Sequence, residues 1–255
     1  MLMMLLSPAK TMTWHPVPAG LPTTLPDFLP QAETLTKVVL ELNLAEIRQL
    51  MNLSIPLGQE ALNRFHRFSP PFTLENSRPA ALYYRGDTYV GLDADTLSLE
   101  DWSFAQERLV ILSGFYGVLR PLDLIQPYRL EMGVSLANER GKNLYAFWGE
   151  SLTQWLDQRL GGKGTVINLA SEEYGKAIQP QGLQGRMITP VFQEIRQGKA
   201  QVIGLLAKRA RGRMARFIID HRVTEASQLQ SYQQEGYTFN PATSTENRWI
   251  FARES

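Results

Sequence analysis

The sequence predicts a mixed α/β fold, a sheet covered by helices, in one compact domain spanning residues 1–255. Strand-like and helical patterns alternate along much of the chain, which is typical of such folds. The composition is ordinary for a globular protein, with 44% apolar and 20% charged residues. We find no repeat and no linker long or polar enough to divide the chain, and 255 residues can bury a sizeable core.

The first third of the chain predicts a buried strand, an extended connector and a run of helices. Residues 1–6 are apolar and are cut off by Ser7-Pro8, without the positive region of a signal peptide, so a first strand is expected there. The prolines between Pro16 and Pro30 indicate an extended loop. Helical patterns follow at residues 32–42, 45–51 and 58–68, which could form a helical subdomain.

The rest of the chain predicts alternating strands and helices. Ser98 and Asp101 form a capping box, so a helix is expected from there to about Glu107. Trp148, Leu152, Trp155, Leu156 and Leu160 would share one face of a helix ended by Gly161-Gly162. Strands are expected at residues 79–84, 108–112, 165–169 and 200–206, with strand-like segments within 237–251 and a long loop at 115–133.

Several classes of site are disfavoured by residue content. The chain has no cysteine, and its three histidines are scattered, so we expect no metal. Glu172-Glu173 is interpreted as a solvated pair. No nucleotide-loop or hydrolase motif is present, so no cofactor is expected. No apolar stretch approaches the ~20 residues of a membrane span. We therefore expect a cytoplasmic protein that does not enter membranes.

The densest charge is the segment Lys208–Arg216, in which five of nine side chains are cationic. On a helix, Arg209, Arg213 and Arg216 would share one face, while an apolar face including Met214 and Phe217 would anchor the helix. Gly212 would lie near the cations and permit a close backbone approach. Asp220 is the first acid after the segment, so few acids are expected to neutralise it.

This segment predicts a polyanion site, because arginine forks match phosphate oxygens. A net charge of +1 means that such binding must come from locally concentrated charge. A solvated basic surface helix and a site for a small phosphorylated ligand are the alternatives.

A second candidate is the helical hairpin at about residues 45–68. Two helices joined by Asn52–Pro56 have the outline of a helix–hairpin–helix, which offers backbone N–H groups and nearby cations such as Arg64 and Arg67 to phosphate. The usual glycines of that hairpin are absent, so a plain helical hairpin is equally compatible with the residues.

Two loops after predicted strands are further candidates, since crevices form beyond the carboxyl ends of strands. In the loop 114–133, Arg120, Asp123, Arg129 and Glu131 could line a crevice or form internal ion pairs. In the other, Ser7 and Lys10 could form a nucleophile pair, and Lys10 could contact phosphate.

Five segments together resemble the YaaA family of bacterial peroxide-stress proteins. They keep the family's order across nearly the whole chain, as SPAKT (7–11), GFYGVLRPLDLIQPYRLEMG (114–133), LYAFWG (144–149), NLASEEY (168–174) and KRARGRMARFII (208–219). The resemblance implies a compact single-domain fold, a basic cleft, a helix–hairpin–helix element, double-stranded DNA binding, and protection against peroxide by lowering unincorporated iron in the cytoplasm.

We therefore expect a monomeric, non-enzymatic protein that binds double-stranded DNA. The expected DNA contacts are Lys10, Arg64, Arg67, Arg120, Lys208, Arg209, Arg211, Arg213 and Arg216. The alternative is an enzyme that processes a damaged base or nucleotide in the basic cleft, with Ser7, Lys10, Asp123 and Arg129 as candidate catalytic residues.

Overall fold

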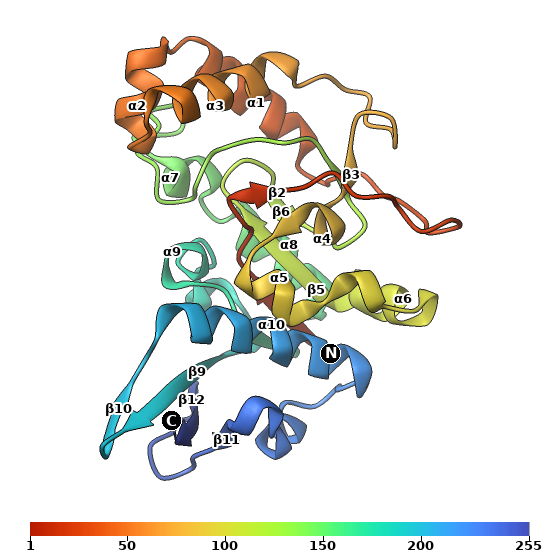
Figure 1. Cartoon of the computed structure of the whole chain (residues 1–255), viewed down its shortest axis with the longest axis vertical. Helices are drawn as coiled ribbons and strands as arrows, with labels where there is room; N and C mark the ends of the chain where they lie inside the picture. The colour runs from red at the N-terminus through yellow and green to blue at the C-terminus, as the bar shows by residue number, and fades with distance from the viewer. Residues whose placement is uncertain (255) are drawn as a thin grey trace.

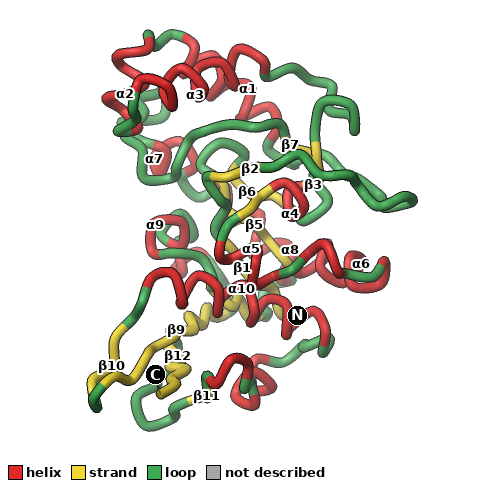
Figure 2. The backbone as a smooth tube through the Cα atoms, in the orientation of Figure 1, coloured by secondary structure: helices red, strands yellow, loops and turns green. Residues whose placement is uncertain are grey.

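The computed structural model describes residues 1–254 and confirms a mixed α/β fold (Figures 1 and 2). The strands are β1 (Leu2–Leu6), β2 (Thr11–Met12), β3 (Arg78–Pro79), β4 (Tyr84–Arg85), β5 (Leu109–Ser113), β6 (Gly117–Leu119), β7 (Leu124–Ile125), β8 (Thr165–Asn168), β9 (Arg186–Arg196), β10 (Lys199–Gln201), β11 (Thr238–Phe239) and β12 (Arg248–Glu254). The helices are α1 (Leu29–Leu40), α2 (Leu44–Met51), α3 (Ile55–Arg67), α4 (Ala80–Tyr83), α5 (Asp87–Leu92), α6 (Leu99–Arg108), α7 (Leu144–Trp148), α8 (Ser151–Leu160), α9 (Glu172–Gly175) and α10 (Gly204–Asp220). Short 3₁₀ turns are η1 (Ala94–Thr96), η2 (Pro180–Gly182), η3 (Ala226–Ser231) and η4 (Gln234–Gly236).

The main sheet has the strand order β11-β12-β9-β8-β1-β5-β6, and β10 pairs with β9. β1 lies at its centre, parallel to β5 on one side and to β8 on the other. All five residues of β1 are buried, as its apolar sequence predicts. β8, β9 and β12 continue the parallel part, whereas β6, β10 and β11 are antiparallel edges.

Helices and strands gather in different parts of the molecule (Figure 1). α1, α2 and α3 lie together at one end, and β9 to β12 lie at the other, with α10 in front of the sheet in this view. α10 packs against α5 and also contacts β1 and β9. Long loops make up much of the region between the helical end and the sheet (Figure 2). Among residues 1–254, no helix combines the length and the apolar character needed to cross a membrane.

Several predicted elements are confirmed. The capping box of Ser98 and Asp101 begins α6, and the basic segment lies on α10 as expected. The two helices of the predicted hairpin are α2 and α3, joined by a turn in which Asn52 is left-handed at φ 51°.

Three predicted elements were wrong. Residues 80–83 form the helical turn α4 instead of a strand, because the Ala80 and Ala81 N–H groups donate to the carbonyls of Asp123 and Pro121. The helix expected through Trp148 is broken into α7 and α8 by Gly149 at φ 49°. The strand expected at residues 200–206 ends at Gln201, and α10 starts at Gly204.

Candidate functional site

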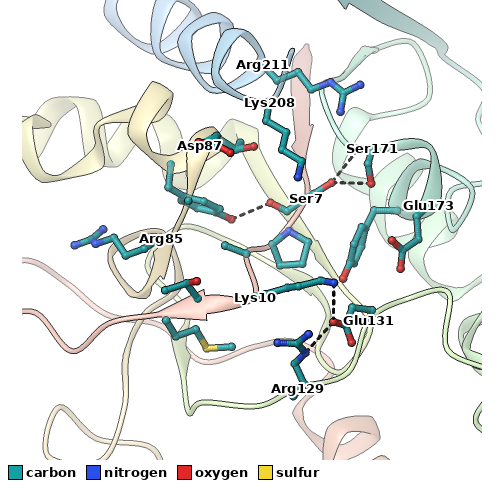
Figure 3. Close-up of a pocket in the computed structure, with 18 of the residues that line it drawn as sticks. Ser7, Lys10, Arg85, Asp87, Arg129, Glu131, Ser171, Glu173, Lys208 and Arg211 are labelled. Carbon is teal, nitrogen blue, oxygen red and sulfur yellow. Dashed lines mark hydrogen bonds and ion pairs between the residues drawn. The ribbon is translucent and has the colours of Figure 1, made fainter. Parts of the chain in front are cut away.

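A pocket of about 420 Å³ lies at the carboxyl ends of β1 and β8 (Figure 3). Ser7 follows β1 directly, and Leu169 and Ser171 follow β8. In the order β9-β8-β1-β5, the chain leaves β1 toward β5 and leaves β8 toward β9, on the opposite side, which makes the carboxyl ends of β1 and β8 a topological switch point. Such points are the usual ligand crevices of open α/β sheets.

Five separate segments line this pocket. They are the loop and strand at residues 7–12, the β4–α5 region at 85–89, the loop at 128–131, the turn at 169–174, and Lys208 and Arg211 of α10. The predicted site loops at 7–11 and 114–133 and the basic helix therefore meet in one place. The charged lining consists of five cations (Lys10, Arg85, Arg129, Lys208 and Arg211) and three acids (Asp87, Glu131 and Glu173).

Lys208 and Arg211 are the cations of this pocket that have no acidic partner in the described part of the chain. Among residues 1–254, neither makes an ion pair or a side-chain hydrogen bond. The Arg211 side chain is half-buried, and burial lowers its pKa. Arginine nevertheless stays protonated. Because the side chain is half-buried, its positive charge is only partly solvated, and no acidic side chain among residues 1–254 compensates it. The Lys208 ammonium points toward Ser7 (Figure 3).

On the opposite side of the pocket, Glu131 is held by two cations. Its Oε1 lies 2.8 Å from Arg129 Nε and 3.4 Å from Lys10 Nζ. The Arg129 N–H is not directed at the carboxylate, so this contact is an ion pair without a hydrogen bond. Glu131 Oε2 is buried and has no hydrogen-bond donor. Lys10 is 67% exposed, so it remains available to solvent or a ligand.

Ser7 is fixed by the turn that follows β8. Its Oγ accepts a hydrogen bond from the Ser171 backbone N–H at 2.8 Å and donates to Ser171 Oγ at 3.2 Å. Its carbonyl accepts from the Tyr89 hydroxyl at 3.1 Å. The structure places Ser7 and Lys10 in the same pocket, but the Lys10 ammonium contacts Glu131. The candidate Ser7–Lys10 nucleophile pair is thus not in contact among the described residues.

The predicted stripe of Arg209, Arg213 and Arg216 lies outside this pocket and is paired with acids. Arg209 and Arg213 reach Glu235 Oε1 at 3.0 and 3.5 Å. Arg216 contacts Asp220 at 2.7 Å and also donates to the Asp93 carbonyl. The expectation that few acids neutralise this segment was wrong, because Glu235 and Asp93 come from distant parts of the sequence.

Gly212 also has a different role from the expected one. A Cβ atom there would lie 1.8 Å from the Thr88 carbonyl oxygen of α5. The close backbone approach at Gly212 is therefore that of α5, with no room left for a ligand on this side of α10.

Arg120 and Asp123 form a structural ion pair remote from the pocket lining. Asp123 is 1% exposed and accepts hydrogen bonds from Thr24 Oγ1 at 2.5 Å and from the Arg120 backbone at 2.7 Å. Arg120 also donates to the Leu25 carbonyl and pairs with Asp27. Burial raises the pKa of Asp123. The internal Arg–Asp and Arg–Glu pairing considered for this loop is thus confirmed, by Arg120–Asp123 and Arg129–Glu131.

The hairpin cations have different surroundings. Arg64 pairs with Glu60 and donates to the Tyr128 carbonyl at 3.0 Å, so it connects α3 to a wall of the pocket. Arg67 is exposed at the end of α3, with no partner among residues 1–254. Gly58 packs against Arg48 of α2, where an added Cβ would come within 2.4 Å of Arg48 Cγ.

Sequence reasoning missed several residues of the pocket. Glu173 lines it and accepts from the Gly133 N–H at 2.9 Å, whereas Glu172 is the solvated member of that pair and contacts Lys176. The position of Ser171 and Glu173 after a strand was a usable signal. Arg85 and Asp87 had no local signal, because the long-range pairing of β2 with β4 brings them there.

Tyrosines form much of the inner wall. The Tyr128 hydroxyl lies 2.7 Å from the hydroxyls of both Tyr84 and Ser113. Burial raises the pKa of Tyr128 to about 12, so this wall is uncharged at neutral pH. No group of three or more His, Asp or Glu side chains that could hold a metal occurs among the described residues.

The sequence profile described as "Peroxide stress protein YaaA" matches residues 1–243. The chain belongs to the YaaA family. It is 47% identical to a UPF0246 protein of Ralstonia pickettii over 99% of both chains, and 46% identical to one of Ralstonia nicotianae over the full length of both. A UPF0246 protein of Cupriavidus metallidurans is 44% identical over 99% of this chain and 98% of its own. The YaaA resemblance expected from the five motifs is therefore confirmed.

Proposed function

We propose that this YaaA family member protects cytoplasmic DNA during peroxide stress by binding double-stranded DNA. The family match supports the peroxide-stress role. The observation that carries the DNA-binding part is the pair Lys208 and Arg211, two pocket cations with no acidic partner among residues 1–254. Cations left uncompensated in the free protein gain most from a phosphate, because the anion replaces the lost solvation.

Two other cations are exposed and could add phosphate contacts. Lys10 is largely exposed at the pocket, and Arg67 is exposed on α3. Arg209, Arg213 and Arg216 could reach phosphate only by leaving Glu235, Asp220 and Asp93, so their contribution would be smaller. Arg64 and Arg120 already make backbone and carboxylate contacts that hold loops together, and we assign them a supporting role.

The test is the salt dependence of binding to a fully paired duplex. Replacing Lys208 and Arg211 together by glutamine should weaken binding and reduce the slope of log affinity against log salt by about two units, about one for each phosphate that is no longer neutralised. Lys163→Gln is the matched control, because Lys163 is exposed and precedes β8 at the opposite end of the parallel strands. An unchanged slope in the double variant would overturn the proposed contacts.

The stripe on α10 provides a second comparison. If Arg209, Arg213 and Arg216 contact DNA as the helical phasing predicts, their triple replacement by glutamine should lower affinity further than the replacement of Lys208 and Arg211. If they serve only to hold Glu235 and Asp220, the triple variant should lose stability with little change in salt slope.

We further propose that the lowering of unincorporated iron follows from this role in cells. This part rests on the resemblance to the family alone. In cells lacking the protein, chelator-accessible iron measured by electron paramagnetic resonance during peroxide exposure should rise, and the wild-type chain should restore it. Restoration by the Lys208/Arg211 double variant would separate the iron effect from DNA binding.

The enzymatic alternative finds its support in the pocket that contains Ser7, Lys10 and Arg129. Incubating the protein with duplexes that carry an oxidised or deaminated base tests it. A released base or a cleaved strand that disappears in Ser7→Ala would establish it, and intact DNA under conditions of full binding would exclude it.

A further inference from the structure

We propose that the pocket at the carboxyl ends of β1 and β8 binds a single nucleotide unit that carries one phosphate, either a free nucleoside monophosphate or an unpaired nucleotide of a DNA strand. This inference deepens the proposed function and depends on it only where DNA is the source of the nucleotide.

The pocket has the size of a small-molecule site. At about 420 Å³, the pocket falls in the range of small-molecule sites, roughly 300–1,000 Å³. A paired duplex cannot enter such a volume, so only its backbone phosphates could reach Lys208 and Arg211. A nucleotide reaches the interior only when it is free or taken out of the base stack.

The pocket has two chemically different ends. Figure 3 shows Lys208 and Arg211 on one side of the loop carrying Ser7 and Lys10, with Arg129 and Glu131 on the other side. Lys208 and Arg211 lie three positions apart on α10 and so project from the same face. They form the end suited to a phosphate.

The other end is suited to a base. Carboxylates accept hydrogen bonds only, and bases carry amino and imino N–H donors on their edges. Glu173 uses Oε1 to accept from Gly133, and Glu131 has no donor at Oε2. Tyr128 and Leu130 provide flat or apolar surface beside them. A ligand with an anion at one end and N–H donors at the other satisfies both ends.

The charges of the lining limit the number of phosphates that the pocket can hold. Asp87, Glu131 and Glu173 share the lining with the cations, and Lys208 and Arg211 are the two lining cations that have no acidic partner among residues 1–254, so the pocket can balance the charge of one phosphate better than that of three. The pocket therefore favours a monophosphate over a triphosphate and over the uncharged nucleoside.

The test measures binding of deoxynucleoside monophosphates, the matching nucleosides and triphosphates, and inorganic phosphate by titration calorimetry. At least one monophosphate should bind more tightly than its nucleoside and its triphosphate. Arg211→Gln should weaken monophosphate binding by about 10- to 100-fold, as expected for the loss of a charged hydrogen bond. Lys163→Gln should bind like the wild type.

A second variant tests the base end separately. Glu173→Gln should weaken the monophosphate but leave inorganic phosphate unchanged, whereas Arg211→Gln should weaken both. Unfolding curves of each variant check that the fold is kept. Equal effects of the two replacements on inorganic phosphate would contradict the assignment of the two ends.

Duplexes distinguish the source of the nucleotide and separate this inference from the proposed function. A duplex with one unpaired nucleotide should bind more tightly than a fully paired one, and a free monophosphate should compete with both duplexes, because all three ligands use Lys208 and Arg211. If the paired duplex binds but neither the monophosphates nor the unpaired nucleotide add anything, the inference is overturned and the proposed function stands. If monophosphates bind and no duplex does, the inference stands and the proposed function fails.

Discussion

At the residue scale, Asp101 shows how a local contact sets the pH dependence of stability. Burial alone would raise its pKa, but hydrogen bonds from the Ser98 hydroxyl and backbone and from Arg222 outweigh burial and lower it. Asp101 Oδ1 lies 2.7 Å from an Arg222 nitrogen. The folded state therefore prefers the ionised carboxyl, which stabilises both the start of α6 and the contact between α6 and the turn after α10.

This gives a pH prediction for Asp101. Because its folded pKa lies below the reference value of 3.8, its stabilising contribution is fully present above that value and is lost as the pH falls through the folded pKa. Asp101→Asn should lower the free energy of unfolding by a constant amount between pH 5 and 8, and the difference from wild type should shrink below about pH 4. Urea unfolding at several pH values measures it, and a difference that grows on acidification would contradict it.

At the element scale, the crossing of α5 and α10 positions the two unpaired cations of the pocket. Gly91 and Gly212 face each other there, and a Cβ added at either glycine would come within 2.2 Å of a backbone atom of the opposite helix. The helices are therefore closer than side chains allow. Lys208 and Arg211 lie within about one turn of this crossing, so its geometry fixes where their side chains enter the pocket.

Gly212→Ala should consequently destabilise the protein by about 1–3 kcal/mol or more, because α10 must move away from α5. The same movement should weaken ligand binding at Lys208 and Arg211. Gly204→Ala is the matched control on the same helix, since nothing lies within 4 Å of its added methyl group. Urea unfolding of both variants measures the effect, and equal stability would show that the helices can separate without cost.

The same elements show which parts of the structure the sequence could predict. The apolar run of β1, the cap of α6 and the helix carrying the basic segment depend on local patterns, and all three were predicted. Residues 80–83 were mispredicted because distant backbone acceptors at Pro121 and Asp123 favour a helical turn. These long-range hydrogen bonds produce no recognisable pattern in the local sequence.

The candidate site, too, could be predicted only where local sequence patterns determine it. The strand-end positions of Ser7, Lys10 and Arg129 predicted their place in the pocket. Helical phasing put the arginines of α10 on defined faces, but the acids that pair with them, such as Glu235, are set by the tertiary fold. That Lys208 and Arg211 have no acidic partner among the described residues could therefore be identified only with the structure in hand.

At the scale of the whole molecule, the charges sort into structural pairs and uncompensated cations. The net charge is +1, and pairs such as Arg120–Asp123 and Arg253–Glu194 neutralise buried carboxylates, the first within one loop and the second between distant segments. Arg211 differs, because burial of its guanidinium is not offset by any acid among residues 1–254. Such a cation costs stability in the free protein, and a ligand recovers that cost on binding.

Matched glutamine replacements of two half-buried arginines test this division. Arg120→Gln leaves the buried Asp123 carboxylate without its cation, so the free energy of unfolding should fall by about 3–5 kcal/mol. Arg211→Gln removes a charge that has no acidic partner among residues 1–254, so stability without ligand should stay the same or rise while phosphate binding weakens. Urea unfolding with and without a nucleoside monophosphate measures both effects. Destabilisation by Arg211→Gln as large as that by Arg120→Gln would show that Arg211 holds the fold together, because only a structural partner would produce that loss in the absence of ligand.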